Sequence, residues 1–316
     1  MSTTVLYIDR LNQAMEKMAI EMCPEDVKLT FLDPVKNGVK GVFEDADVLW
    51  NTTAKINRDI IDMTPKLKLI QRTGVGVDNT DVAYAREKGI PVSICKGMNA
   101  VSVAELAILH MMALYRRIVT LDNLGKKGEW HTWTYRLESF ELLGKTIGVF
   151  GAGAIGREVI KRVKAFGTRV IYNDIVQMSP EDEKALGCEY VSFNDLIVQS
   201  DILTIHAPWL ESTTGIIGKK QFEQMKRTAI LVNTARSNIV NHEDLIDALE
   251  NKLIMGAGVD VYEPEDPLHG IEAQGLNLIV TPHIGAATFD NYDRVYKFCF
   301  ENAQRIGRGE SPLFTL

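Results

Sequence analysis

The 316-residue sequence lacks the features that mark nucleic-acid-binding, membrane and secreted proteins. Its net charge is −7, so it has no basic surplus that would attract nucleic acid or an anionic membrane surface. No apolar run approaches the roughly 20 residues of a membrane span. The first residues show neither the basic region nor the apolar region of a signal peptide. These absences predict a cytoplasmic protein without a nucleic-acid or membrane partner.

Patterns for disulfide, hydrolase and metal chemistry are missing too. The four cysteines are scattered and form no CxxC pair, which indicates reduced thiols. No GxSxG sequence is present for a serine hydrolase. Asp260, Glu265 and His283 could in principle bind a metal ion, but their spacing matches no standard zinc pattern. We therefore expect no metal.

The stretch from Thr146 to Asp174 carries the pattern of a dinucleotide-binding unit. A short apolar strand leads to Gly151, Gly153 and Gly156, an amphipathic helix follows, and a second strand ends at Asp174. The three glycines would permit the tight turn, the approach of a pyrophosphate and the close packing of helix on sheet. The helix N-terminus attracts phosphates, and the carboxylate binds a ribose diol and repels a 2′-phosphate. The stretch therefore predicts NAD rather than NADP.

Strands and helices alternate before and after this stretch. Short apolar strands separated by helices are typical of parallel sheets covered on both faces, and the length suits two domains. We therefore expect an α/β fold with two doubly wound parallel sheets. Residues 100–119 predict one long helix, apolar over most of its surface and buried on both sides, either as a connector between domains that contributes to a subunit interface or as a fully buried core helix. Residues 124–136 are rich in aromatics and predict a loop packed on a second subunit or on its own chain.

Chemically useful side chains follow the ends of the later strands, and such ends share one edge of a parallel sheet. Hydride transfer to a keto carbon leaves an oxygen that needs a proton, and His283 is our choice of donor. Glu265 would hold the far ring nitrogen, and Arg236 would polarise the carbonyl and bind a carboxylate. Taken alone, each residue also has a structural explanation: His283 as a turn residue, Arg236 as a surface arginine and Glu265 as part of a solvated acidic loop. His206 is left outside the catalytic set, as a histidine with a structural role at a strand end.

Six ordered motifs resemble the D-isomer-specific 2-hydroxyacid dehydrogenase family, which includes D-3-phosphoglycerate dehydrogenase, glyoxylate and hydroxypyruvate reductases and D-lactate dehydrogenase. They are RTGVGVDN (72–79), NAVSVAE (99–105), GKTIGVFGAGAIG (144–156), NTAR (233–236), GVDVYEPE (258–265) and TPHIGAAT (281–288). The resemblance implies a flavodoxin-like substrate domain, 1–98 with 289–316, around an inserted Rossmann NAD domain, 99–288. It also implies a homodimer through the NAD domain.

The same resemblance assigns roles to residues. It implies Arg236, Glu265 and His283 as the catalytic set, with Arg236 and His283 also contacting the substrate. Backbone amides around Val75 and Gly76 would hold the substrate carboxylate. The residues that would line NAD follow the strand ends: Gly151, Gly153, Ala154, Ile155, Gly156, Asp174, His206, Ala207, Pro208, Thr213, Thr234, Ala235, Asp260 and His283.

The sequence also departs from the family pattern. Ser237 replaces the usual glycine after the NTAR arginine, and Asn51 stands where phosphoglycerate-specific relatives often have arginine, which argues against a phosphorylated substrate. No C-terminal regulatory domain is expected after Leu316. Two alternatives stay open. A formate-dehydrogenase-like enzyme usually pairs the histidine with glutamine, so Glu265 argues against it. A co-repressor-like protein would bind NAD(H) without turnover.

Overall fold

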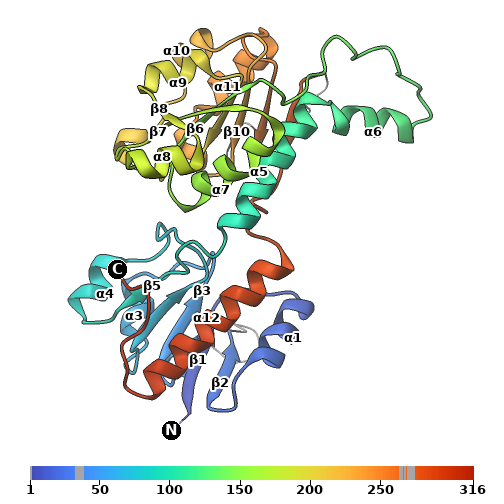
Figure 1. Ribbon diagram of the computed structural model, residues 1–316. Coiled ribbons are helices and arrows are strands. Elements are labelled where there is room, and N and C mark those ends of the chain that lie inside the picture. Colours follow the sequence, from blue (N-terminus) through green and yellow to red (C-terminus); the bar gives the residue numbers. More distant parts are fainter. Residues whose placement is uncertain (1, 33–38, 263–265, 267, 269–274) are drawn as a thin grey trace. The chain divides into compact units, whose positions relative to one another are not determined.

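The computed structural model describes residues 2–32, 39–262, 266, 268 and 275–316. The chain divides into two compact units, a first unit of residues 1–99 with 288–316 and a second unit of residues 100–287 (Figure 1). Each unit is built around one parallel sheet with helices on both faces. The predicted α/β architecture with two parallel sheets is confirmed.

The first unit has a five-stranded sheet in the order β2-β1-β3-β4-β5, which is the flavodoxin-like order. Its strands are β1 (Thr3–Tyr7), β2 (Val27–Phe31), β3 (Val48–Asn51), β4 (Leu69–Arg72) and β5 (Val92–Ser93). Successive side chains of a strand point to opposite faces. Val5 and Tyr7 therefore enter the core on one face of the sheet, while Leu6 and Ile8 enter the core on the other.

Helices from both ends of the chain cover this sheet. α1 (Gln13–Met22) and α12 (Phe289–Gly307) share the core of one face, where α12 crosses the strands (Figure 1). α2 (Val39–Phe43), α3 (Arg58–Asp62) and α4 (Val82–Glu87) belong to the other face. The last helix of the chain thus completes the unit that the first residues begin.

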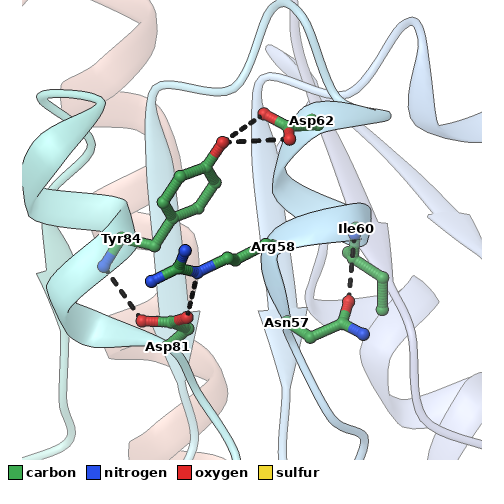
Figure 2. Close-up of polar contacts among 6 residues, drawn as sticks. All are labelled: Asn57, Arg58, Ile60, Asp62, Asp81 and Tyr84. Atoms are coloured by element: carbon green, nitrogen blue, oxygen red, sulfur yellow. Dashed lines mark hydrogen bonds and ion pairs between the residues drawn. The ribbon is translucent and has the colours of Figure 1, made fainter.

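Polar side chains cap α3 and α4 and also link the two helices (Figure 2). Asn57 caps α3, and Asp81 caps α4 by accepting from the N–H of Tyr84 at 2.9 Å. The same carboxylate accepts from Nε of Arg58 at 3.3 Å, and the hydroxyl of Tyr84 donates to Asp62 at 2.9 Å (Figure 2). Each of these two helices therefore donates to a carboxylate of the other.

The second unit has a seven-stranded sheet in the order β12-β11-β10-β9-β6-β7-β8. Its strands are β6 (Thr146–Phe150), β7 (Arg169–Asn173), β8 (Glu189–Tyr190), β9 (Ile202–Ile205), β10 (Ile230–Asn233), β11 (Gly256–Val259) and β12 (Leu278–Val280). The strand order reverses between β6 and β9, as in dinucleotide-binding sheets. In such sheets ligands bind at the carboxyl ends of the strands beside this reversal.

Two layers of helices enclose the second sheet (Figure 1). α5 (Ala100–Tyr115) and α7 (Ala154–Val163) share one core, and α9 (Phe193–Gln199), α10 (Lys219–Gln224) and α11 (His242–Glu250) share the other. α8 (Pro180–Leu186) packs beside α7, and 3₁₀ turns lie at η1 (Lys164–Phe166), η2 (Glu211–Thr213) and η3 (Ser237–Ile239). Within the described residues, none of the helices combines the length and the apolar character that a membrane crossing requires.

The prediction of one helix over 100–119 is wrong. α5 ends at Tyr115, Arg117 adopts a left-handed φ of +51°, and α6 (Ile118–Lys126) begins after it, within a stretch partly predicted as loop. Within the single chain one side of α5 is open, since Leu109 is 59% exposed, so its expected burial against a second subunit stays a prediction. Packing of the aromatic segment on its own chain is not observed at Trp130, which is 92% exposed. The second unit therefore presents large apolar side chains to its surroundings.

Candidate active site

The loop after β6 depends on glycine for two close backbone approaches. Gly151 has a φ of +93°, and a Cβ there would lie 2.3 Å from the backbone nitrogen of Ala207. A Cβ on Gly156 would lie 2.1 Å from the carbonyl oxygen of Gly151. Both distances are impossible for real atoms, so these glycines let the β9 loop and α7 lie directly against the turn.

Gly153 differs from its two neighbours, because a Cβ there would meet nothing within 4 Å. It is the N-cap of α7, and no side chain from the described part of the chain caps this helix. Ala154 is exposed and Ile155 half-buried in the first turn. The open space lies before a helix N-terminus, where N–H groups and the helix dipole favour an anion. This arrangement fits the phosphates of a dinucleotide.

Asp174 follows β7 and lies beside the glycine loop. Its Oδ2 accepts from the N–H of Ala152 at 2.6 Å, and the hydroxyl of Tyr190 donates to its backbone carbonyl at 3.3 Å. Because β7 pairs with β6, the carboxylate lies at the same sheet edge as the glycine loop. That position suits a ribose diol of a nucleotide whose phosphates lie at α7.

The end of β9 is held by short polar contacts. The backbone N–H of His206 donates to the carbonyl of Phe150 at 2.7 Å, and its Nε2 lies 2.9 Å from Oγ1 of Thr204. Burial lowers the pKa of His206 to about 3, so its ring is neutral at neutral pH and does not serve as a proton donor. The hydroxyl of Thr213 donates to the carbonyl of Pro208 at 3.0 Å and fixes the following loop.

Asn233, the last residue of β10, shapes the turn that carries Arg236. Its side-chain oxygen accepts from the N–H of Ala235 at 3.0 Å, and its side-chain amide donates to the carbonyl of Arg236 at 3.0 Å. Thr234 is buried, while Arg236 is half-buried and donates from Nη1 to the carbonyl of Ala235 at 2.8 Å. The sequence pattern did not single out Asn233, although it begins the NTAR motif.

Asp260 follows β11 and anchors the loop after β12. Its buried carboxylate accepts from the hydroxyl of Thr281 at 2.6 Å and from the N–H groups of Ile284 at 2.9 Å and Gly285 at 2.8 Å. Its backbone carbonyl accepts from the N–H of His283 at 2.8 Å. Three side-chain bonds and one backbone bond therefore fix the loop from residue 281 to residue 285.

His283 occupies this loop in a strained conformation. Its φ is +54°, in the left-handed region, and its side chain is exposed. A non-glycine residue held there costs about 1–3 kcal/mol, and such strain persists only where the surroundings impose it, often at functional sites. The bonds to Asp260 supply that constraint and leave the imidazole accessible.

Glu265, the predicted partner of His283, lies outside the described residues. The adjacent Asp266 is described, and its Oδ2 pairs with Nδ1 of the buried His242 and accepts from the hydroxyl of Ser237 at 3.2 Å. Ser237 directly follows Arg236 in the chain. The residue beside Glu265 is thus tied to the turn that carries the predicted substrate-binding arginine.

Val75 and Gly76 lie in the first unit, in the loop after β4. The buried Arg72 ends this strand, and its Nε and Nη2 donate to the carbonyl of Gly76 at 3.0 and 2.8 Å. Val75 is exposed at the turn. Arg72 was also not singled out from the sequence, although it is the first residue of RTGVGVDN.

The second sheet therefore gathers the predicted residues of its unit at one edge. The carboxyl ends of β6 and β7 carry the glycine loop and Asp174, and those of β9 to β12 carry the segments with His206, Arg236, Asp260 and His283. In the described parts of the chain, no group of three His, Cys, Asp or Glu side chains is placed to hold a metal ion.

Residues 108–285, more than half of the chain, match the family model for the NAD-binding domain of D-isomer-specific 2-hydroxyacid dehydrogenases. The chain belongs to the D-isomer-specific 2-hydroxyacid dehydrogenase family. It is 38% identical over 295 residues to a hydroxypyruvate reductase from Thermotoga maritima, covering 92% of this chain and 94% of that protein. It is 36% identical over 287 residues to a glyoxylate reductase from Korarchaeum cryptofilum, covering 88% of this chain and 85% of that protein.

A solved structure of this family is similar over nearly the whole chain. It is D-lactate dehydrogenase from Aquifex aeolicus, complexed with NAD and lactic acid, with a TM-score of 0.83, 27% identity and coverage of 97% of this chain and 96% of that one. As a D-2-hydroxyacid dehydrogenase, the protein is an NAD-dependent oxidoreductase that transfers hydride between NAD(H) and 2-oxo or 2-hydroxy acids. The predicted family, cofactor and reaction class are confirmed.

Proposed function

We propose that this D-2-hydroxyacid dehydrogenase reduces small, unphosphorylated 2-oxo acids such as glyoxylate and hydroxypyruvate, with His283 as the acid. The names of two relatives above 35% identity support this substrate class. The single observation that carries the proposal is the His283 loop. An exposed imidazole is held in a strained conformation by Asp260, at the same sheet edge as the glycine loop.

We assign the cofactor to the strand ends of the second unit. When bound, NAD(H) supplies or accepts the hydride. The first turn of α7, from Gly153 to Gly156, would hold the phosphates, and Asp174 would hold the adenosine ribose. The turn at Gly151 would bring these groups together. The other assigned residues follow the ends of β9, β10, β11 and β12: His206, Ala207, Pro208, Thr213, Thr234, Ala235, Asp260 and His283.

Asp260 has room for one further role. Its Oδ1 already accepts from the hydroxyl of Thr281 and the N–H of Ile284. Among the described residues, its Oδ2 accepts only from the N–H of Gly285. A carboxylate oxygen has two acceptor sites, so Oδ2 retains one for a donor. We assign that site to the nicotinamide carboxamide.

The catalytic residues act on the substrate's charge and proton. During reduction the keto oxygen becomes negative and must take a proton, which the imidazolium of His283 donates. To Glu265, which lies outside the described residues, we assign the far ring nitrogen, where a carboxylate would favour the protonated ring. Arg236 binds the substrate carboxylate and polarises the carbonyl, and the backbone amides of Val75 and Gly76 bind the carboxylate as well. In the reverse direction His283 accepts the proton.

Asn51 supports an unphosphorylated substrate. It ends β3, is fully buried, and donates from its side chain to the carbonyl of Ala54 at 2.8 Å. Its neutral amide, already bonded to the backbone, offers no positive charge to a phosphate. We therefore expect phosphohydroxypyruvate to be a poor substrate.

We further propose that residues 1–98 with 289–316 form the substrate domain and that residues 99–288 form the NAD domain and mediate a homodimer. Exposed apolar side chains in the second unit support self-association, since Leu109 is 59%, Trp130 92% and Leu137 96% exposed. Sedimentation velocity should give a dimer for the wild type and dissociation for a Trp130→Ser/Leu137→Ser variant. A monomeric wild type would contradict the proposal. A cytoplasmic location also remains a prediction, which cell fractionation tests.

A substrate panel tests the proposed function. NADH oxidation should be fastest with glyoxylate or hydroxypyruvate, slower with pyruvate and slowest with phosphohydroxypyruvate. Formate with NAD should give no turnover. NADH binding without turnover on any of these acids would support the co-repressor-like alternative, and formate oxidation would support the formate-dehydrogenase-like one.

A further inference from the structure

His110 is a buried histidine on α5 that the mechanism above does not use. It is 2% exposed and packs on Gly258 of β11. A Cβ on Gly258 would lie 2.9 Å from Nδ1 and 3.0 Å from Cβ and Cγ of His110. Glycine at this position therefore leaves the space that the imidazole fills. Gly258 lies two residues before Asp260, so the ring reaches the base of the active-site edge.

The ring contacts the His283 loop through one hydroxyl. Nε2 of His110 lies 3.4 Å from Oγ1 of Thr281, which donates to Oδ1 of Asp260 at 2.6 Å. The single hydroxyl proton of Thr281 is committed to the carboxylate, so Oγ1 is an acceptor toward His110. A hydrogen bond at this contact therefore requires the proton on Nε2 of His110. Its Nδ1, buried and without a hydrogen-bond partner among the described residues, is the bare nitrogen.

In this tautomer His110 is a neutral hydrogen-bond donor. Burial lowers the pKa of His110, although the charge of Asp260 raises it in part, so the ring is neutral at neutral pH. A second proton on Nδ1 would place an unbonded N–H against Gly258. Burying such a group without a partner is unfavourable, so the second proton is disfavoured. The contact to Thr281 is therefore made by one N–H donor of fixed position.

We propose that His110 is a positioning residue for proton transfer at His283. Its Nε2–H orients the Thr281 hydroxyl toward Asp260. The carboxylate of Asp260 in turn holds the amides that follow His283, and its backbone carbonyl holds the amide of His283 itself. Without the donor, the hydroxyl keeps only its bond to Asp260, and the hydrogen bonds that hold the loop from residue 281 to residue 285 weaken. This inference rests on the proposed role of His283 as the acid.

Three variants and one control test the role. His110→Leu removes the donor, His110→Gln keeps an N–H near the position of Nε2, and Thr281→Val removes the hydroxyl with little change of shape. Met111→Leu is the control, because Met111 is the next residue of α5, is buried and loses no hydrogen-bonding group. For each enzyme, kcat, the KM for a 2-oxo acid, the NADH dissociation constant and the thermal midpoint are measured.

We expect His110→Leu to lower kcat about tenfold, roughly the effect of losing one hydrogen bond, and Thr281→Val, which loses the contacts to both His110 and Asp260, to lower it at least as much, with the NADH dissociation constant within about twofold of wild type in both. His110→Gln should recover most of kcat. The double variant His110→Leu/Thr281→Val should be no worse than Thr281→Val alone, because that change already removes the contact to His110. Met111→Leu should behave as wild type.

A wild-type kcat in His110→Leu overturns the inference. A His110→Gln enzyme as slow as His110→Leu also overturns it, because ring volume rather than the N–H would then matter. If His110→Leu does not fold, the near-isosteric Thr281→Val decides, and a wild-type kcat there is again a refutation. His283→Ala separates this inference from the proposed function: high turnover in that variant removes the function, whereas its inactivity beside normal His110 variants removes only the role of His110.

Discussion

Gly153 and Gly156 lie in one loop, and replacing each with alanine should damage a different property. At Gly156 the new Cβ would lie 2.1 Å from the carbonyl oxygen of Gly151 and 3.3 Å from Cγ1 of Val149. The obstacle at 2.1 Å is backbone, so α7 must move away from β6. Such overpacking costs about 1–3 kcal/mol, while the better helix propensity of alanine offsets up to about 1 kcal/mol. Because the obstacle is backbone at 2.1 Å, the cost should be about 3 kcal/mol, and we expect a net loss of about 2 kcal/mol in the free energy of unfolding.

At Gly153 the same change should spare stability and weaken cofactor binding. A Cβ there meets nothing within 4 Å, and the φ of −71° suits alanine. Alanine is a poorer N-cap than glycine, so the free energy of unfolding should fall by less than about 1 kcal/mol. The methyl group would occupy the space before the N-terminus of α7. NADH should therefore bind at least about tenfold more weakly, which corresponds to about 1.4 kcal/mol.

Urea unfolding of the cofactor-free variants and fluorescence titration with NADH measure both properties. Gly125→Ala is a matched control, because Gly125 lies in α6 and a Cβ there meets nothing within 4 Å. It should leave NADH binding unchanged and not lower stability. Wild-type NADH affinity in Gly153→Ala would refute the phosphate assignment. Wild-type stability in Gly156→Ala would refute the close approach of α7 to β6.

Three further predictions concern single residues at the sheet edge. Asp174→Ala should weaken NADH binding and reduce the preference over NADPH, and an unchanged ratio of the two dissociation constants would contradict its assignment to the ribose. Asp260→Asn should lower the free energy of unfolding in urea by about 1–3 kcal/mol and also lower kcat, because an amide replaces an acceptor in the clamp; equal unfolding midpoints would contradict this. The pKa of His206 falls from 6.5 to about 3 on folding, so only the unfolded chain takes up its proton between these values. Stability should therefore fall as pH drops below about 6.5, at up to about 1.4 kcal/mol per pH unit, and His206→Asn should lose this component in urea unfolding at a series of pH values. Identical pH dependence in both proteins would contradict the lowered pKa of His206.

Much of the second unit could be predicted because its signals are local. The run from Thr146 to Asp174 encodes a strand, a glycine turn, a helix and a strand in sequence order, and Gly167 ends the helical segment with a φ of +71° as its position predicts. The strand-end residues could be grouped because parallel strands place their carboxyl ends at one edge. This rule alone placed Asp260 and His283 at that edge, without knowledge of any contact between them.

The missed features depend on contacts between distant parts of the chain. His110 and Thr281 are 171 positions apart, and nothing local to either indicates that Gly258 leaves room for the ring between them. The bond from Arg72 to Gly76 requires a particular turn that the spacing alone does not specify. Arginine is a good helix former, so nothing in the sequence indicated that Arg117 would adopt the left-handed conformation that separates α5 from α6.

His283 is assigned the transfer of the proton when hydride reaches the substrate. The most direct measurement is the single-turnover rate of NADH oxidation by His283→Ala with saturating 2-oxo acid, beside its NADH dissociation constant. Loss of a general acid should slow this rate by about 10²–10⁴-fold, while the NADH dissociation constant stays within about twofold of wild type. A rate within about tenfold of wild type would contradict the claim, because another group would then be supplying the proton.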